Sequence, residues 1–282
     1  MASASSFRPH RLRSAAGIFT AAFCAGLVVI VLMLILGYVI REGIGAMSVA
    51  FVTQLPHPVG VPGGGVANGI VGSAIIVGIA SLMAIPIGAL TGVYLTYFGR
   101  GNVASAVRFL SDVLSGIPSI AIGLFAYTLL VAPFGHFSAL SASFAFAILM
   151  LPVIITTTES ALKGVSRELY EGALALGISR QRTIMRIIFP SARSGIVTGI
   201  VLAVARVTGE TAPLLFTAFG SQFWELNPSN PMAELSLQVF TYAISPYRSW
   251  HQQAWGGALI LIFMVFFMNL AARLALKTGL RV

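Results

Sequence analysis

Residues 169–190 read LYEGALALGISRQRTIMRIIFP. The apolar residues in the first half of this segment recur at helical spacing, and Gly177 is the residue type that commonly ends a helix in a left-handed turn. Ser179 is a good N-cap for a second helix, which is expected to run to Pro190. The segment therefore predicts two short helices joined by a glycine turn.

The chain on both sides of this segment is strongly apolar. Of the 282 residues, 57% are hydrophobic and 9% charged, and the mean hydropathy is +0.92. A helix needs about 20 apolar residues to cross about 30 Å of hydrocarbon. Six runs satisfy this requirement: residues 15–40, 68–98, 110–132, 138–161, 194–219 and 253–276. The sequence therefore predicts an all-α membrane protein with six transmembrane helices.

Three parts are expected along the chain. Residues 1–67 hold an N-terminal tail, the first transmembrane helix and an external loop. Residues 68–276 form a domain with the other five helices, and residues 277–282 form a C-terminal tail. The first apolar run is longer than the 7 to 15 residues of a signal-peptide core, so it is expected to stay as an anchor. The lone cysteine, Cys24, lies within it, which excludes an internal disulfide and a cysteine-based metal site.

The distribution of basic residues predicts the orientation. If the N-terminus is cytoplasmic, 14 of the 17 Lys and Arg residues lie in cytoplasmic stretches. Only Arg41 and Arg248 then lie outside, and Arg206 lies within the fifth run. The positive-inside rule therefore places both termini and the 169–190 segment in the cytoplasm. This arrangement accounts for the net charge of +9 without a nucleic-acid partner.

The fifth run contains two charges, Arg206 and Glu210. Arg206 is expected about 18 Å into the hydrocarbon, where a charge is costly and faces protein or a water-filled cavity. The spacing of four lets the two residues pair, so the charges predict either a translocation pathway or a structural ion pair. Thr211 adds a hydroxyl that can bond back to its helix, and Pro213 favours a kink in it. Pro86, Pro118 and Pro152 are expected to mark bends in the second, third and fourth runs.

The 169–190 segment resembles the EAA loop of ABC importer permeases. The matching residues are Glu171, Ala173, Gly177, Ile187 and Pro190. The chain departs from the pattern at Gly172, where the family has Ala, and at Phe189, where it has Leu. The resemblance implies a coupling helix that sits in a cleft of a separate ATP-binding subunit. The alternative is a basic helix that lies on anionic lipid.

Three further sets of residues are similar to the corresponding segments of phosphate ABC transporter permeases. They are residues 205–219 with Gln222-Phe223-Trp224, residues 116–120 with 123–125, and residues 245–247 with Trp250 and Gln253. The resemblance covers most of the chain from Gly63 and is to the second of two permease subunits. It implies a type I permease fold in a bacterial inner membrane. It also implies a homologous partner permease, a pair of ATP-binding subunits and an external phosphate-binding protein, with ATP held by the partner and no cofactor here.

Other function classes fit less well. A secondary transporter, in which Arg206 and Glu210 relay protons, predicts inverted repeats and broken helices, and neither is clear in the sequence. Apart from the resemblance, the residues leave open the alternative of an ABC permease for another oxyanion. A membrane enzyme is disfavoured because no His, Cys or acidic cluster gathers in one place. Residues 63–65 are three glycines without the lysine of a phosphate-binding loop.

Overall fold

A computed structural model describes residues 8–58, 61 and 63–278. The described chain is helical apart from its connections and one isolated bridge between Phe219 and Met232. The helical elements in chain order are α1 (Arg8–Gly43), the 3-10 turn η1 (Ile44–Ala46), α2 (Val49–Thr53), α3 (Ala67–Tyr97), α4 (Asn102–Gly116), α5 (Ser119–Ala126), the π-helical turn η2 (Tyr127–Val131), α6 (Ala132–Phe134), α7 (Ala139–Lys163), α8 (Arg167–Ala175), α9 (Arg180–Thr183), the π-helical turn η3 (Ile184–Ile188), α10 (Phe189–Ser191), α11 (Arg193–Thr208), α12 (Leu214–Thr217), α13 (Leu235–Ala243) and α14 (Arg248–Thr278).

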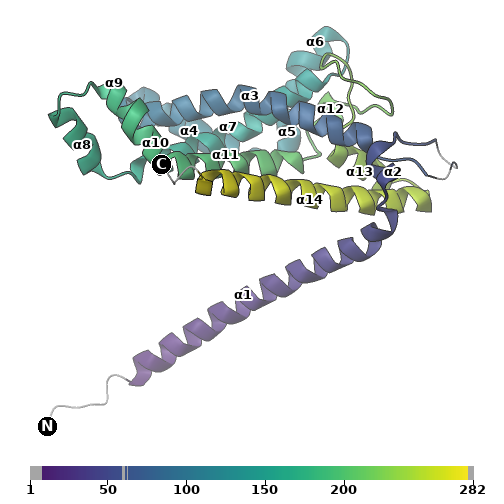
Figure 1. Ribbon diagram of the computed structural model, residues 1–282, viewed down its shortest axis with the longest axis horizontal. Helices are drawn as coiled ribbons and strands as arrows, with labels where there is room; N and C mark the ends of the chain where they lie inside the picture. Colours follow the sequence, from purple (N-terminus) through teal and green to yellow (C-terminus); the bar gives the residue numbers. More distant parts are fainter. Residues whose placement is uncertain (1–7, 59–60, 62, 279–282) are drawn as a thin grey trace.

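Long helices run side by side along the molecule. Figure 1 shows α3, α7, α11 and α14 in this bundle, with α8 and α9 projecting at one end and α6 and α12 at the other. Four described stretches are long and apolar enough to cross a membrane, namely Gly17–Ala46, Ala67–Tyr97, Ala139–Lys163 and Arg248–Ala271. Two bent helix pairs bring the total to as many as six. The chain is therefore an all-α, multi-pass membrane protein.

The third predicted span is broken at Pro118. It begins at Asn102 rather than at residue 110, and α4 and the α5–α6 segment meet at 105°. Ile117 and Pro118 are extended, with ψ of 132° and 135°. A residue before proline is driven out of the helical region because it clashes with the proline ring. The predicted bend at Pro118 is confirmed, but it is a break between two helices. Pro86 and Pro152, where bends were also expected, lie inside the uninterrupted helices α3 and α7.

The fifth predicted span also differs from a single helix over residues 194–219. Helix α11 ends at Thr208, and Pro213 is the N-cap of the separate helix α12. The predicted kink at Pro213 within one helix is therefore wrong. Pro213 cannot donate the bond that would continue the helix, and the glycine at 209 has little helical preference, so the helix stops before them. At its other end α11 bends by 68° from the segment Arg180–Ser191.

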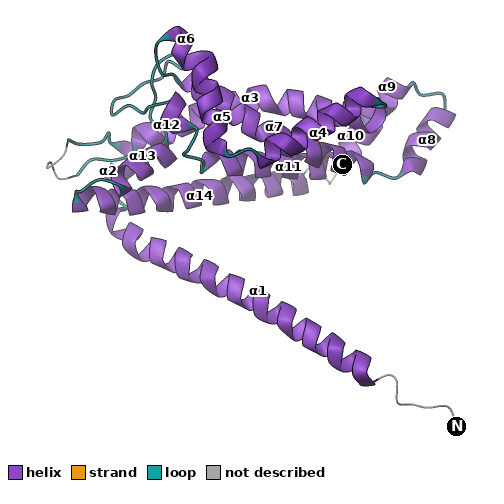
Figure 2. Ribbon diagram, turned by 180° about the vertical axis from the view of Figure 1, so that it is seen from behind, coloured by secondary structure: helices purple, strands orange, loops and turns teal. Residues whose placement is uncertain are grey.

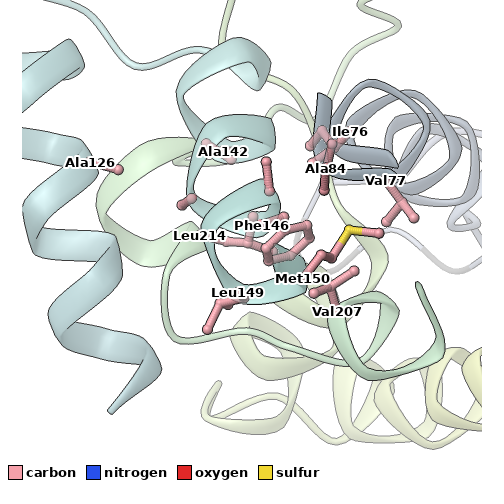
Figure 3. Close-up of a cluster of buried hydrophobic side chains, with 14 of the residues drawn as sticks. Ile76, Val77, Ala84, Ala126, Ala142, Phe146, Leu149, Met150, Val207 and Leu214 are labelled. Carbon is pink, nitrogen blue, oxygen red and sulfur yellow. The ribbon is translucent and has the colours of Figure 1, made fainter. Parts of the chain in front are cut away.

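The core surrounds α7. Figure 3 shows Phe146 and Met150 of α7 among side chains of α3, α11 and α12, and both are fully buried. Close helix contact depends on glycine: a Cβ at Gly92 of α3 would lie 2.7 Å from Cβ of Thr158 in α7. Small residues let membrane helices approach in this way. The interface between α3 and α7 therefore fixes the central pair of the bundle.

Helix α1 diverges from the bundle, as Figure 2 shows. It joins the rest of the molecule at its C-terminal end, where the Tyr38 and Trp255 rings meet edge to face at 5.2 Å. The side chains of residues 18–35 are exposed and nearly all apolar. A surface of this kind is stable in lipid or against another membrane protein.

Candidate functional site

The candidate pathway residues lie where the two broken spans meet. Ser119, the first residue of α5, donates its hydroxyl to Oε1 of Glu210 at 2.7 Å. Glu210 lies just past Gly209, the C-cap residue of α11. Helices α4 and α11 have 15 and 16 residues. At 1.5 Å per residue each is about 23 Å long, too short to cross the hydrocarbon alone. Neither helix can span by itself, and the Ser119–Glu210 hydrogen bond forms the junction between the break in the third span and the end of α11.

Arg206 does not pair with Glu210. The residue is exposed, and within the described part of the chain it has no hydrogen-bond or ion-pair partner. The predicted i to i+4 geometry fails because the helix ends at Thr208, so Glu210 follows a different backbone path and bonds Ser119 instead. Arg206 thus offers an unneutralised guanidinium, directed away from this chain's own core, in the last turn of a membrane helix.

Glu234 is a buried acid that the sequence analysis missed. It has no exposed surface and is the N-cap residue of α13. The carboxylate accepts from the Ser73 hydroxyl at 2.8 Å, from Ser236 N at 2.7 Å and from Leu237 N at 3.0 Å. Burial raises the pKa of Glu234, and these hydrogen bonds reduce the rise. The Ser236 hydroxyl lies 2.6 Å from Glu234 Oε2 and 3.1 Å from the backbone oxygen of Glu210. Glu234 is therefore linked to the junction.

The other two predicted pathway residues belong to the backbone of the junction. The Thr211 carbonyl accepts from Leu214 N at 3.1 Å, which starts the turn into α12. Pro213 is buried and packs on α5, since a Cβ at Gly123 would lie 2.5 Å from the Pro213 Cα. The back-bonding hydroxyl expected in this region is found at Thr208, which donates to the Val204 carbonyl at 2.8 Å.

The predicted pair of loop helices is present. In α8 the Ser166 side chain caps the N-terminus, accepting from Leu169 N at 3.3 Å. At the other end Gly177 has φ of +79°, Gly177 N bonds the Leu174 carbonyl and Ile178 N bonds the Ala173 carbonyl. This pair of bonds is a Schellman motif, so the glycine turn is confirmed in detail. Ser179 occupies the next N-cap but makes no side-chain cap bond.

The loop residues divide into an inner and an outer set. Ala173 is buried and Ile187 is half-buried. Glu171 is exposed and pairs with Arg167 at 2.7 Å, while a Cβ on Gly172 would meet open space. Pro190 is exposed too. The helix continues past Pro190 to Ser191, because the preceding turn η3 is π-helical. The outer surface of α8 is therefore free to contact another protein.

Aromatic and cationic contacts hold the loop against the end of α3. The Tyr97 and Tyr170 rings stack with centroids 5.3 Å apart. Arg180 donates to the Tyr97 carbonyl and lies over the Phe98 ring at 4.5 Å. A displacement of α8 or α9 would act directly on the end of a membrane-spanning helix.

A family model, described as binding-protein-dependent transport system inner membrane component, matches residues 84–277. The chain belongs to this family. The match includes both the loop helices α8–α10 and the junction between α11 and α12. Members of this family are transport components, so the chain is a transport subunit and not an enzyme.

Three relatives show how far the similarity extends. The phosphate transport system permease protein PstA of Yersinia pestis is 42% identical over 243 residues, which is 86% of this chain and 82% of the relative. The protein of the same name from Haemophilus influenzae is 44% identical over 241 residues, 85% of each chain. PstA 1 of Mycobacterium tuberculosis H37Rv is 40% identical over 211 residues, 74% of this chain and 68% of the relative.

Solved structures agree on the fold. An inward-facing structure of the MetNI methionine ABC transporter has a TM-score of 0.62 at 16% identity, covering 76% of this chain and 95% of that one. A bacterial ABC transporter involved in alginate import has a TM-score of 0.57 at 16% identity, covering 93% and 98%. The chain therefore has the type I importer permease fold.

Broken helices were expected of a secondary transporter, yet this family member has a span broken at Pro118 and a helix, α11, that ends inside the fifth predicted span. Breaks alone therefore do not separate the two classes of transporter. The described residues also contain no group of three or more His, Cys, Asp or Glu side chains placed to hold a metal ion.

Proposed function

We propose that this subunit forms, with a homologous partner permease, the path by which an ATP-driven importer carries inorganic phosphate across the bacterial inner membrane. The observation that carries this proposal is the guanidinium of Arg206 at the end of α11, which has no partner in the part of the chain that the structure describes. A membrane-embedded arginine is stable when it faces protein or a water-filled cavity, so it fits a path between two subunits. The relatives named as phosphate permeases support phosphate as the substrate.

Arg206 would meet phosphate by charge-assisted hydrogen bonds, because a guanidinium presents a planar fork of donors to phosphate oxygens. Glu210, held by Ser119, would keep the α5 and α11 ends together and repel an anion that strays from Arg206. Thr211 and Pro213 would shape the backbone of the path. No cofactor is needed on this chain, and the ATP that drives transport would be bound by the partner ATP-binding subunits.

The loop helices would transmit the action of the ATP-binding subunits to the translocation path. The charge distribution supports a cytoplasmic position for both termini and for α8–α10. Leu176, 82% exposed, and Gly172 lie on the open surface of α8. That surface fits a cleft of one ATP-binding subunit, and an external phosphate-binding protein would deliver the anion on the opposite side. A pull on α8 would reach α3 through Tyr170 and Arg180.

Phosphate uptake into vesicles that contain the assembled transporter tests the proposal. Arg206→Gln should abolish uptake while the complex still assembles, and Arg193→Gln, an exposed arginine at the other end of α11, should leave uptake intact. Glu171→Lys should reduce ATP-dependent uptake by weakening the contact with the ATP-binding subunit. Uptake without ATP, or full uptake by the Arg206→Gln complex, would overturn the assignment.

A further inference from the structure

A cavity with a basic lining lies at the loop end of the bundle. A cavity of about 500 Å³ opens between the end of α3, the end of α7 and the inner side of α8. Its lining includes four cationic side chains and no acidic one among the described residues: Arg100, Lys163, Arg167 and Arg180. Ser166 and Tyr170 add hydroxyl groups to the same wall.

The cations around this cavity are only partly neutralised. Lys163 lies 2.8 Å from Glu159, but Arg108 shares the same carboxylate at 3.0 Å. Arg167 is paired with Glu171. The remaining two, Arg100 and Arg180, have no carboxylate partner among the described residues.

Of those two, Arg180 donates to a backbone carbonyl, and Arg100 is exposed with no hydrogen-bond or ion-pair partner among the described residues. The site therefore carries an excess of positive charge that a bound anion would relieve.

We propose that this cavity binds a phosphate group, either the phosphodiester of an anionic lipid headgroup or a soluble phosphate anion. Both sources fit its position, because α3 and α7 are membrane-spanning helices and the cavity opens where they end. Basic pockets of this kind at a membrane boundary bind lipid phosphate, and arginine clusters bind phosphate anions in general. The assignment of this boundary to the cytoplasmic side rests on the proposed function. The chemistry of anion binding is independent of it.

A bound phosphate group would join two parts of the molecule. Arg167 and Tyr170 belong to α8, whereas Lys163 belongs to the end of α7 and Arg100 follows α3. An anion held by both sets ties the loop helix to the bundle, and its loss leaves the Tyr97–Tyr170 stack and the contacts of Arg180 to hold the loop. The site is therefore a means of setting how firmly α8 is held.

Lipid binding is tested on the complete transporter purified in detergent with phosphatidylglycerol. Native mass spectrometry counts the lipids that stay bound, and affinity is measured for the unmodified complex, Arg100→Gln and Arg100→Lys. Arg100 loses no hydrogen bond or ion pair to any described residue when it is replaced, so the fold should be unaffected. Losing one charge-assisted contact should weaken binding about tenfold, and the lysine variant should recover most of it. The matched control is Arg182→Gln, an exposed arginine of α9 outside the cavity.

Soluble anions are tested in nanodiscs of phosphatidylcholine alone. Amide hydrogen exchange of residues 167–175 is followed as inorganic phosphate is added. Protection in the unmodified complex that is lost in Arg100→Gln assigns the site to soluble phosphate, and lipid retention without such protection assigns it to lipid. If Arg100→Gln behaves like Arg182→Gln in both assays, the site does not exist. Uptake is not used as a readout, so this outcome is independent of whether the transporter carries phosphate.

Discussion

Replacement of Glu234 by alanine should strongly destabilise the end of the bundle where α13 packs against α3. The carboxylate is the acceptor for two backbone N–H groups, those of Ser236 and Leu237, and for the Ser73 hydroxyl. The hydroxyl groups can rotate toward other acceptors, whereas the two N–H groups at the start of α13 cannot. Each buried N–H left without an acceptor costs about 1 to 2 kcal/mol, and loss of the cap is part of the same cost. The total is about 3 kcal/mol, or a fall of roughly 10 °C in melting temperature.

Glu234→Gln separates hydrogen bonding from charge. The amide oxygen can accept from both N–H groups while the amide nitrogen donates to the Ser73 hydroxyl oxygen, so the expected cost is below about 1 kcal/mol. Thermal unfolding of the purified complex measures both variants. Asp112→Ala, a change at an exposed acid of α4 that has no hydrogen-bond or ion-pair partner among the described residues, is the control and should leave the melting temperature nearly unchanged. A Glu234→Ala complex that melts within about 2 °C of the unmodified one would refute the reasoning.

The pH dependence of the Glu234→Gln difference has a defined sign. Burial raises the pKa of Glu234 in the folded state, so the folded chain holds this proton more tightly than the unfolded chain. The stabilisation is complete below the ordinary glutamate pKa and is lost as pH rises through the raised value. The glutamine variant has no such proton, so its melting temperature relative to the unmodified complex should rise with pH. A constant difference across that range would show that the two states bind this proton equally.

Three further predictions concern the loop and the bundle. Gly177→Ala should lower the stability of the loop by about 1 kcal/mol because φ at Gly177 is +79°. Gly172→Ala should stabilise α8 by up to about 1 kcal/mol, because alanine has the higher helix propensity and its Cβ meets open space. Hydrogen exchange of α8 measures both changes. Tyr170→Ala removes the stack with Tyr97 and should speed exchange of α8 about tenfold; an unchanged rate would mean the stack does not hold the loop. Gly92→Val forces α3 from α7 and should lower the melting temperature, whereas Gly78→Ala, with nothing within 4 Å, should not.

Much of the architecture follows from local sequence. The apolar runs predict membrane helices because backbone groups in lipid must bond within their own segment. The loop of residues 169–190 was predicted with its turn at Gly177, because a left-handed residue at a helix end is a local requirement that glycine meets. The bend at Pro118 was predicted for the same kind of reason.

The sequence pattern failed where distant segments compete for a partner. Arg206 and Glu210 stand four residues apart, which predicts an ion pair if the helix continues. The helix stops at Thr208, and Ser119, 91 residues away along the chain, takes the carboxylate. Glu234 was missed because its burial and its partner Ser73, 161 residues distant, exist only after folding.

The sequence by itself determined that the chain crosses a membrane several times and that a helix pair turns at Gly177. Each of these depends on composition or on the conformational preference of neighbouring residues. The tertiary structure alone decided that the third span breaks at Pro118 and that α11 ends at Thr208. It also decided that Arg206 has no partner among the described residues, and that one cavity is lined by Arg100, Lys163, Arg167 and Arg180. These features depend on which helix ends meet in space, and the spacing of residues along one helix carries no information about that.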